Sequence, residues 1–107
     1  MKIIRNNILP FKGFSAINLF GILFVRKNAR LSEKTLNHER IHTSQMKELL
    51  YIPFYIWYVI EWLARLIQFR NSYMAYRNTS FEREAYQNQE DMHYLKSRRF
   101  FNFLNYL

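Results

Sequence analysis

The sequence predicts a mainly α-helical domain with a short β strand or hairpin, an α+β fold of about three helices. Only two glycines and two prolines occur in 107 residues, so few positions interrupt a helix. Three segments carry helical caps or helical periodicity, and one apolar segment near the N-terminus is rich in Ile, Phe and Val. The length suits one domain, residues 1–107, with a single modest core.

The first quarter of the chain holds the predicted β element. Residues 1–13 have the pattern of an irregular lead-in, punctuated by Pro10 and Gly13. Residues 14–26 predict a strand or short hairpin that ends in the basic turn 26–28. A buried helix is the alternative for so apolar a segment, because Gly21 alone does not exclude it.

A helix is expected to begin after Ser32, which is a good N-cap residue and is followed by Glu33 in the first turn. Its pattern continues to about Leu50. Pro53 then breaks or kinks the chain, because proline lacks an N–H and restricts the residue before it.

Residues 54–69 predict an amphipathic helix with a wide apolar face. The more polar stripe comprises Tyr51, Tyr55, Tyr58, Glu61, Arg65 and Gln68, and the aliphatic stripe comprises Ile52, Ile56, Val59, Leu63 and Leu66. The preferred interpretation is a core helix of a small domain. A helix lying in a membrane interface is the main alternative. A membrane-spanning helix ranks last, because Glu61 and Arg65 are costly at membrane depth.

The C-terminal third predicts one further helix. Residues 70–79 are polar and turn-prone, and the helix is expected from near Ser80 to about Arg99, with acids first and bases last as the helix dipole favours. The tail, residues 100–107, alternates aromatic residues with Asn and is expected to pack against the body.

The charge balance indicates an anionic neighbour. Sixteen basic residues stand against eight acidic ones, a net charge of +8, which favours nucleic acid or an anionic membrane surface. No recognisable nucleic-acid-binding module is present, so no specific nucleic-acid partner is expected. The first residues lack the features of a signal peptide, which favours a cytoplasmic protein or one peripheral to the inner face of the membrane.

One pentapeptide carries a specific chemical signal. His38-Glu39-Arg40-Ile41-His42 is an H-E-x-x-H sequence. On a helix, His38 and His42 lie one turn apart on the same face and can both bind one tetrahedral zinc ion. Glu39 would lie beside the open coordination position, where it can take a proton from a metal-bound water.

A zinc ion held by two histidines needs a third protein ligand if one position is to remain open. The chain has no cysteine, and no third histidine follows at close spacing, so a carboxylate from another helix is expected. The candidates after the motif are Glu48, Glu61, Glu82, Glu84, Glu90 and Asp91.

The two segments His38–His42 and Phe81–Tyr86 resemble the gluzincin-type zinc metallopeptidases, and more closely a group of very short bacterial proteins with the same motif. The resemblance covers roughly residues 14–95 and implies a minimal zincin-like scaffold with an apolar strand bordering the cleft. Aligned on Ala85, it implies Glu82 as the third ligand. It also places Tyr86 where many members have an Asp or Asn that orients a zinc-bound histidine, so another acceptor is needed.

Three residues of this segment allow more than one role. Glu82 is also the last residue of a possible capping box, Thr79-Ser80-Phe81-Glu82, in which its carboxylate would bind the Thr79 N–H. Glu84 is the alternative third ligand, or the acceptor that orients a zinc-bound histidine, and otherwise a solvated acid. Tyr86 either donates a hydrogen bond to a developing oxyanion or is simply packed. His93 is expected on the surface.

These patterns predict a zinc-dependent metallopeptidase. His38, His42 and Glu82 would bind Zn²⁺, Glu39 and Tyr86 would act in catalysis, and a peptide or protein substrate would lie antiparallel to the strand around 20–25. The alternative is a non-catalytic helical module at a membrane surface or partner interface, with or without bound metal. The aromatic helix, the positive charge and the small size favour that alternative.

Overall fold

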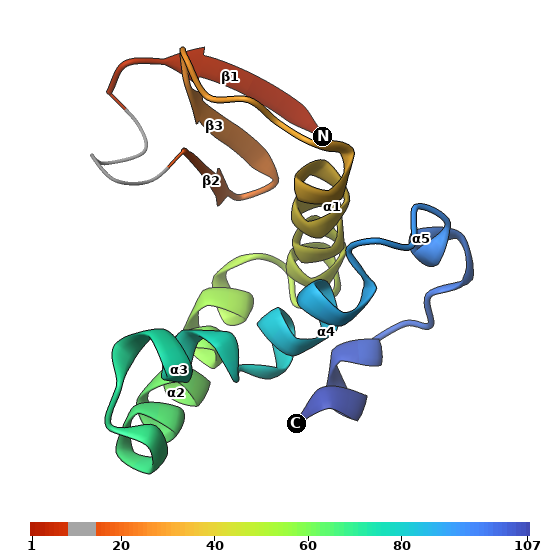
Figure 1. Ribbon diagram of the computed structural model, residues 1–107. Helices are drawn as coiled ribbons and strands as arrows, with labels where there is room; N and C mark the ends of the chain where they lie inside the picture. The colour runs from red at the N-terminus through yellow and green to blue at the C-terminus, as the bar shows by residue number, and fades with distance from the viewer. Residues whose placement is uncertain (9–14) are drawn as a thin grey trace.

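The computed structural model describes residues 1–8 and 15–107. In chain order its elements are β1 (Lys2–Asn6), β2 (Ala16–Leu19), β3 (Ile22–Arg26), α1 (Glu33–Glu48), α2 (Ile52–Phe69), α3 (Ser72–Arg77), α4 (Ser80–Asn88), α5 (Tyr94–Ser97) and the 3-10 helix η1 (Asn102–Tyr106). The sheet lies at one end of α1, and α2, α3 and α4 gather at the other (Figure 1). The predicted mainly α fold with a short β element is confirmed. The predicted breaks at Pro10 and Gly13 lie outside the described residues.

The predicted hairpin forms as β2 and β3. Phe20 and Gly21 make its tight turn with φ values of 54° and 84°, a backbone conformation that suits a two-residue hairpin turn and favours glycine. The alternative of a buried helix is therefore wrong, because Gly21 serves the turn.

The expectation of an irregular lead-in over residues 1–13 is wrong for Lys2–Asn6, which forms β1. β1 pairs in parallel with β3, and β2 pairs antiparallel on the other side, giving the strand order β1-β3-β2. A parallel partner is far away along the chain, so local sequence carries little signal for this strand. β3 is central, and β2 lies at an edge of the described sheet.

The break between α1 and α2 follows the predicted signals. Ser32 caps α1 by accepting a hydrogen bond from the Thr35 N–H. Leu50 and Tyr51 then adopt positive φ values of 59° and 66°, and Pro53 stands in the first turn of α2. The two helices are bent by 111° at this break. Among the described residues, no single helix is long and apolar enough to cross a membrane, and α1 and α2 meet that test only as a bent pair.

The helical core is aromatic. Phe81 of α4 is fully buried, with ring centroids 4.6 Å from Phe54 of α2 and 4.7 Å from Phe103 of η1. Trp57 packs edge-on against Phe103 at 5.2 Å. The tail therefore packs back on the body as predicted, and it completes the core rather than covering it.

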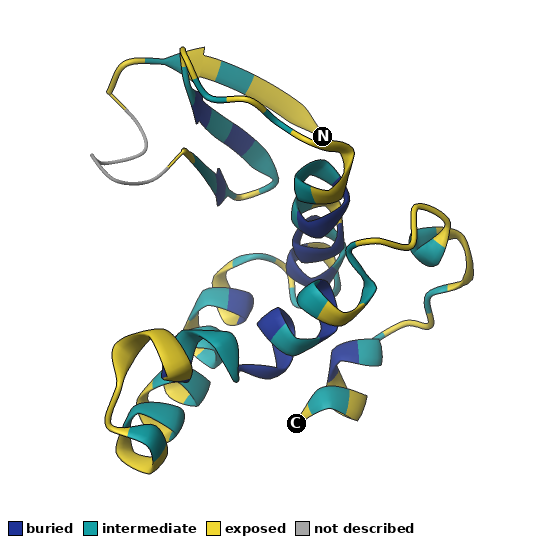
Figure 2. Ribbon diagram, viewed as in Figure 1, coloured by how far each residue is buried: buried dark blue, intermediate teal, exposed yellow. Residues whose placement is uncertain are grey.

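α2 contributes to the core, but not through the aliphatic stripe that the preferred core-helix interpretation would bury. Its aromatic side contacts α1, α4 and η1, whereas its aliphatic stripe faces solvent (Figure 2). Phe54 is the one residue of α2 that is buried in the described structure. Periodicity located both stripes but did not decide which of them meets the core, because Tyr and Trp bury more area than Ile or Val.

Two C-terminal predictions need correction. The segment expected to be turn-prone contains α3, which Asn71 caps by accepting from the Met74 N–H. The helix expected from Ser80 to Arg99 ends at Asn88. The Asn37 side chain donates to the carbonyls of Asn88, Gln89 and Asp91, so a tertiary contact satisfies the end of α4.

Candidate metal centre

The H-E-x-x-H segment lies in the middle of α1, where it is held against the sheet. The Asn18 side chain of β2 donates to the Glu39 carbonyl at 3.1 Å and to the Thr43 hydroxyl at 3.0 Å. His38 and His42 are buried, and their rings meet edge-on with centroids 4.7 Å apart. Their Nε2 atoms lie 3.0 Å from one another, as expected for histidines four residues apart on one helix.

Glu82 reaches this pair from the first turn of α4. Its Oε1 lies 3.2 Å from His38 Nε2 and 3.0 Å from His42 Nε2, so three potential ligand atoms converge. Tetrahedral zinc, with bonds of about 2.0–2.2 Å, holds its ligand atoms roughly 3.3 Å apart. The spacing of these three atoms is close to that of a zinc site, and the donor set of two imidazoles and one carboxylate suits zinc.

Only one of the two hydrogen bonds of the possible capping box at Glu82 forms. Thr79 caps α4 by accepting a hydrogen bond from the Glu82 N–H at 3.3 Å. The Glu82 carboxylate does not complete a capping box, because Oε1 faces the histidines and Oε2 accepts from the Tyr58 hydroxyl at 2.8 Å. The backbone and side chain of Glu82 therefore serve different purposes.

The outer nitrogens of both histidines are held by glutamine side chains. His38 Nδ1 lies 2.8 Å from Gln89 Oε1, and His42 Nδ1 lies 2.8 Å from Gln45 Oε1. The amide nitrogen of Gln45 donates to the Phe81 carbonyl and to Glu84, so its oxygen faces His42. An oxygen acceptor at Nδ1 favours the tautomer whose Nε2 lone pair faces the centre and can bind a metal.

These two glutamines are the histidine acceptors that Tyr86 cannot provide. The resemblance implied that an Asp at this position would orient a zinc-bound histidine. Instead, Gln89, the residue just after the last turn of α4, holds His38. Gln45, three residues after His42, holds the second histidine. Neither glutamine was assigned this role from sequence, although Gln45 lies on the same predicted helix face as both histidines.

Glu84 is neither a solvated acid nor part of the converging group. It is fully buried and accepts hydrogen bonds from Gln45, Tyr94 and Arg98. Burial disfavours its charge, but these donors, Arg98 foremost, hold the pKa of Glu84 below its ordinary value. Arg98 also forms a bidentate pair with Glu48 at 2.8 and 3.0 Å. A chain of contacts thus runs from His42 to the C-terminal segment.

The pKa values of His42 and Glu82 are shifted because the two side chains lie in contact. Burial works against the charged form of His42, but the adjacent Glu82 carboxylate outweighs it and raises the pKa of His42 to about 9. Burial likewise works against ionised Glu82, yet the two histidines hold the pKa of its carboxyl far below its usual range.

Glu39 stands beside this group with a different environment. Its Oε2 is buried and has no hydrogen-bond partner in the described part of the chain. Burial raises the pKa of Glu39, and the two histidines oppose that rise only in part. A carboxylate whose pKa is raised by burial, beside potential metal ligands, is a candidate general base.

A cavity of about 850 Å³ opens onto the centre. Its polar end is formed by His38, Glu39, His42 and Glu82, and the edge strand β2 forms one wall. The remaining lining is mostly apolar or aromatic and comprises Met46, Phe54, Tyr55, Tyr58, Ser72, Tyr73, Tyr76 and Tyr86. The candidate general base and the converging ligands therefore share one accessible space with an extended backbone.

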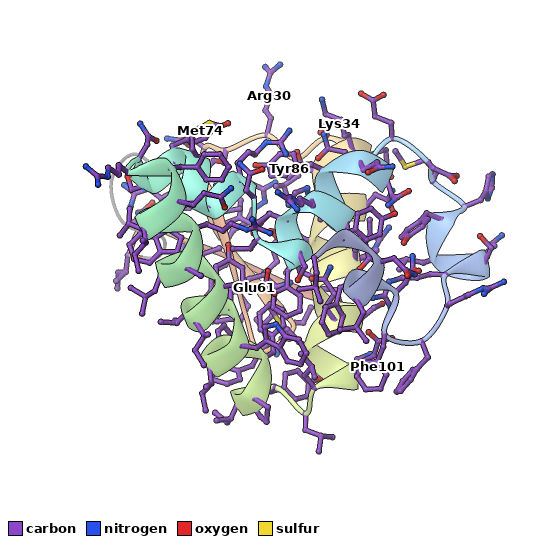
Figure 3. The ribbon with its side chains drawn as sticks, turned by 90° about the horizontal axis from the view of Figure 1, so that it is seen from below. Arg30, Lys34, Glu61, Met74, Tyr86 and Phe101 are labelled. Atoms are coloured by element: carbon purple, nitrogen blue, oxygen red, sulfur yellow. The ribbon has the colours of Figure 1, made fainter. Side chains whose placement is uncertain are left out.

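Tyr86 lies between α1 and α3, at the rim of the centre (Figure 3). Its ring packs edge-on against His38 at 4.5 Å, and its hydroxyl forms a 2.7 Å hydrogen bond with the Tyr76 hydroxyl. The Arg77 guanidinium stacks on the other side, 3.6 Å from the ring centroid. Tyr86 is thus packed and also lines the cavity. His93 is exposed, as predicted.

Sequence reasoning missed Tyr58 and Tyr76 as residues of this site. Tyr58 binds Glu82, and Tyr76 presents a second hydroxyl at the cavity. Tyr58 lies on the more polar stripe of α2, which was a usable signal, because a tyrosine hydroxyl removed from solvent needs a partner. The strand expected to bind substrate also needs correction. Residues 22–26 form the central strand β3, whereas β2 is the edge strand that lines the cavity.

The chain matches no protein-family model, and neither the curated proteins nor the solved structures contain a match.

Proposed function

We propose that this protein is a zinc-dependent metallopeptidase. The observation that carries the proposal is the convergence of His38 Nε2, His42 Nε2 and Glu82 Oε1 within 3.0–3.2 Å of one another. Glu39, whose Oε2 atom is buried and has no hydrogen-bond partner among the described residues, lines the same cavity. This combination supplies three ligands, room for a fourth and a base beside it.

Zinc bound here would polarise a substrate carbonyl and lower the pKa of a water molecule at the open position. Glu39 would accept a proton from a water molecule at that position while the water oxygen bonds to the carbonyl carbon. When the C–N bond breaks, Glu39 returns the proton to the amine nitrogen. The raised pKa of Glu39 suits both transfers.

The remaining residues orient the reacting groups. Gln45 and Gln89 keep the histidine Nε2 atoms directed at the centre, and Tyr58 fixes the second oxygen of Glu82. Tyr76 and Tyr86 present a pair of hydroxyls at the cavity, from which either can donate to a developing oxyanion. A peptide would pair with the edge strand β2, which places its backbone across the centre.

Hydrolysis of a fluorescence-quenched peptide library by zinc-loaded protein tests this function. We expect cleavage by the wild type and a loss of about a hundredfold to ten-thousandfold in Glu39→Gln, because proton transfer is removed. Glu39→Gln should retain its zinc. Glu33→Gln, an exposed substitution on the same helix, should leave the rate unchanged. Equal turnover by wild type and Glu39→Gln, or none by zinc-loaded wild type across the library, would reject the proposal.

A further inference from the structure

α2 carries an unusually apolar exposed face. The aliphatic face, as used below, comprises Ile52, Ile56, Val59, Ile60, Leu63 and Ile67, whose side chains are between 48 and 80% exposed. These residues recur at intervals of one, three or four, so they form one stripe along the 18-residue helix. Their exposure places them on the side of α2 that faces away from the aromatic core. A continuous surface of this kind marks an interaction site.

The apolar surface continues beyond the helix. Leu50, in the break before α2, is 77% exposed, and Tyr73 and Met74 of α3 are exposed next to the far end of α2. Tyr73 also lines the cavity, so the surface reaches the rim of the candidate metal centre. An occupant of this surface would lie close to the cavity entrance.

The charges bordering the aliphatic face are basic. Lys47 precedes the face at the end of α1, Arg70 follows it on the same line of the helix, and both are exposed. The two nearby acids are turned inward. Glu61 accepts from the backbone N–H and hydroxyl of Ser80, and Glu48 pairs with Arg98. The face thus carries no charged residue along its length, and an exposed basic residue stands near each end of it in the sequence.

The charge of the whole molecule reinforces this asymmetry. Of the eight acidic residues, all within the described ranges, only Glu33, Glu90 and Asp91 are exposed. None of them lies on α2 or α3, and the segment before α5 lies across the molecule from α2 (Figures 1 and 3). The surface around α2 is therefore more basic than the net charge of +8 alone implies.

We propose that α2 docks flat on an anionic lipid surface, with its aliphatic face among the acyl chains and Lys47 and Arg70 among the headgroups. Helices with a broad aliphatic face and flanking basic residues bind in this way. A second copy of the chain fits the charges less well. An antiparallel pair of α2 helices would bring Lys47 of one copy to Arg70 of the other, and a parallel pair would bring the two Arg70 side chains together. Anionic headgroups would instead attract both Lys47 and Arg70.

Vesicle flotation of the full chain tests the proposal without reference to the metal. We expect the wild type to float with vesicles of phosphatidylcholine mixed with phosphatidylglycerol, and to bind vesicles of phosphatidylcholine alone less. The double substitution Ile60→Gln and Ile67→Gln should weaken binding by about tenfold or more, because it removes two large apolar contacts. Ile8→Gln with Met92→Gln, which changes two exposed apolar residues elsewhere, is the matched control and should bind like the wild type.

The charges are tested separately. Lys47→Glu with Arg70→Glu should lower binding to the mixed vesicles by about tenfold or more, since each basic residue near an anionic surface contributes roughly 1 kcal/mol. The control variant Lys27→Glu with Lys34→Glu has the same net charge. It should bind the vesicles more tightly than the Lys47→Glu with Arg70→Glu variant. Equal weakening by both pairs would overturn the proposal. Wild type that stays in the soluble fraction would also overturn it. The proposal would fail as well if sedimentation velocity showed a wild-type dimer that the double substitution Ile60→Gln and Ile67→Gln dissociates.

Discussion

Gln45 links the candidate metal centre to the rest of the protein. Its amide oxygen holds His42 Nδ1, and its amide nitrogen binds the Phe81 carbonyl and Glu84. Because both of those acceptors lack a hydrogen to donate, the orientation of the amide is determined. The orientation of the amide in turn favours the His42 tautomer that a metal requires.

Replacing Gln45 by Leu should weaken zinc binding by about tenfold to a hundredfold, the usual effect of removing a partner of a metal-bound histidine. Competition with a chromophoric chelator measures the affinity, and circular dichroism shows whether the variant is folded. Gln87→Leu, an exposed change on α4, should bind zinc like the wild type. A folded Gln45→Leu variant with unchanged affinity would show that His42 does not depend on this contact.

At the scale of single residues, the sequence predicted the converging groups better than their partners. His38, Glu39 and His42 follow from a five-residue motif on one helix, and Glu82 followed from resemblance. Gln89 lies 51 residues from His38 and Tyr58 lies 24 residues from Glu82, so no local pattern identifies the partner of either residue. The role of Glu84 was missed because its partner Arg98 lies beyond the end of α4.

Among the elements, α4 has its two ends fixed by side chains from other helices. Glu61 of α2 binds Ser80 at its start, and Asn37 of α1 binds three carbonyls at its end. Glu84, in the middle, joins α4 to the C-terminal segment through Arg98. The position of α4, and with it that of Glu82, therefore depends on polar contacts as much as on the Phe81 core.

Asn37→Ala should lower the free energy of unfolding by about 1–3 kcal/mol, because it removes the side chain that donates to three carbonyls at the end of α4. Thermal or urea denaturation of the metal-free protein measures the change. Asn28→Ala, in the exposed turn after β3, should have little effect and serves as the control. If both variants unfold like the wild type, water rather than Asn37 satisfies the end of α4.

The Glu84 carboxylate should make stability depend on acid pH. A carboxyl with a lowered pKa in the folded chain stabilises it above its ordinary pKa of 4.5, and that contribution is lost as the pH falls through the folded value. Urea unfolding of metal-free protein between neutral pH and acid should therefore show a steeper loss of stability for wild type than for Glu84→Gln. Glu90→Gln, an exposed control, should follow the wild type. Parallel curves for wild type and Glu84→Gln would contradict this account.

The boundaries of elements were predictable where a local cap or breaker defines them. Ser32 and Pro53 mark the start of α1 and the start of α2, as their chemistry requires. β1 and the end of α4 were mispredicted because each depends on a distant partner, β3 in one case and Asn37 in the other. Local sequence cannot encode such contacts.

For the molecule as a whole, η1 is an integral part of the core. Phe103 is fully buried between Phe81 and Trp57, whereas its near neighbour Phe100 is 72% exposed. Phe103→Ala should therefore lower the free energy of unfolding by about 3–5 kcal/mol. Phe100→Ala removes the same atoms from an exposed site and should change it much less. Similar losses from the two substitutions would show that the tail does not complete the core.

The arrangement of α2 was the least predictable feature at this scale. Helical periodicity identified an aliphatic stripe and a more polar, tyrosine-rich stripe, and both exist. Which stripe faces inward is decided by the shape of the remaining core, where the rings of Phe81 and Phe103 receive Phe54 and Trp57. The aliphatic face is left exposed, and this single outcome leads to the proposed lipid surface.

The metal content of the purified protein tests the central claim most directly. After reconstitution and gel filtration, wild type should contain one zinc ion per chain by elemental analysis. His42→Ala and Glu82→Ala should contain almost none, because each removes one of three ligands, whereas Glu90→Gln should retain the ion. Wild type without stoichiometric zinc, or Glu82→Ala with its full complement, would contradict a metal centre formed by His38, His42 and Glu82.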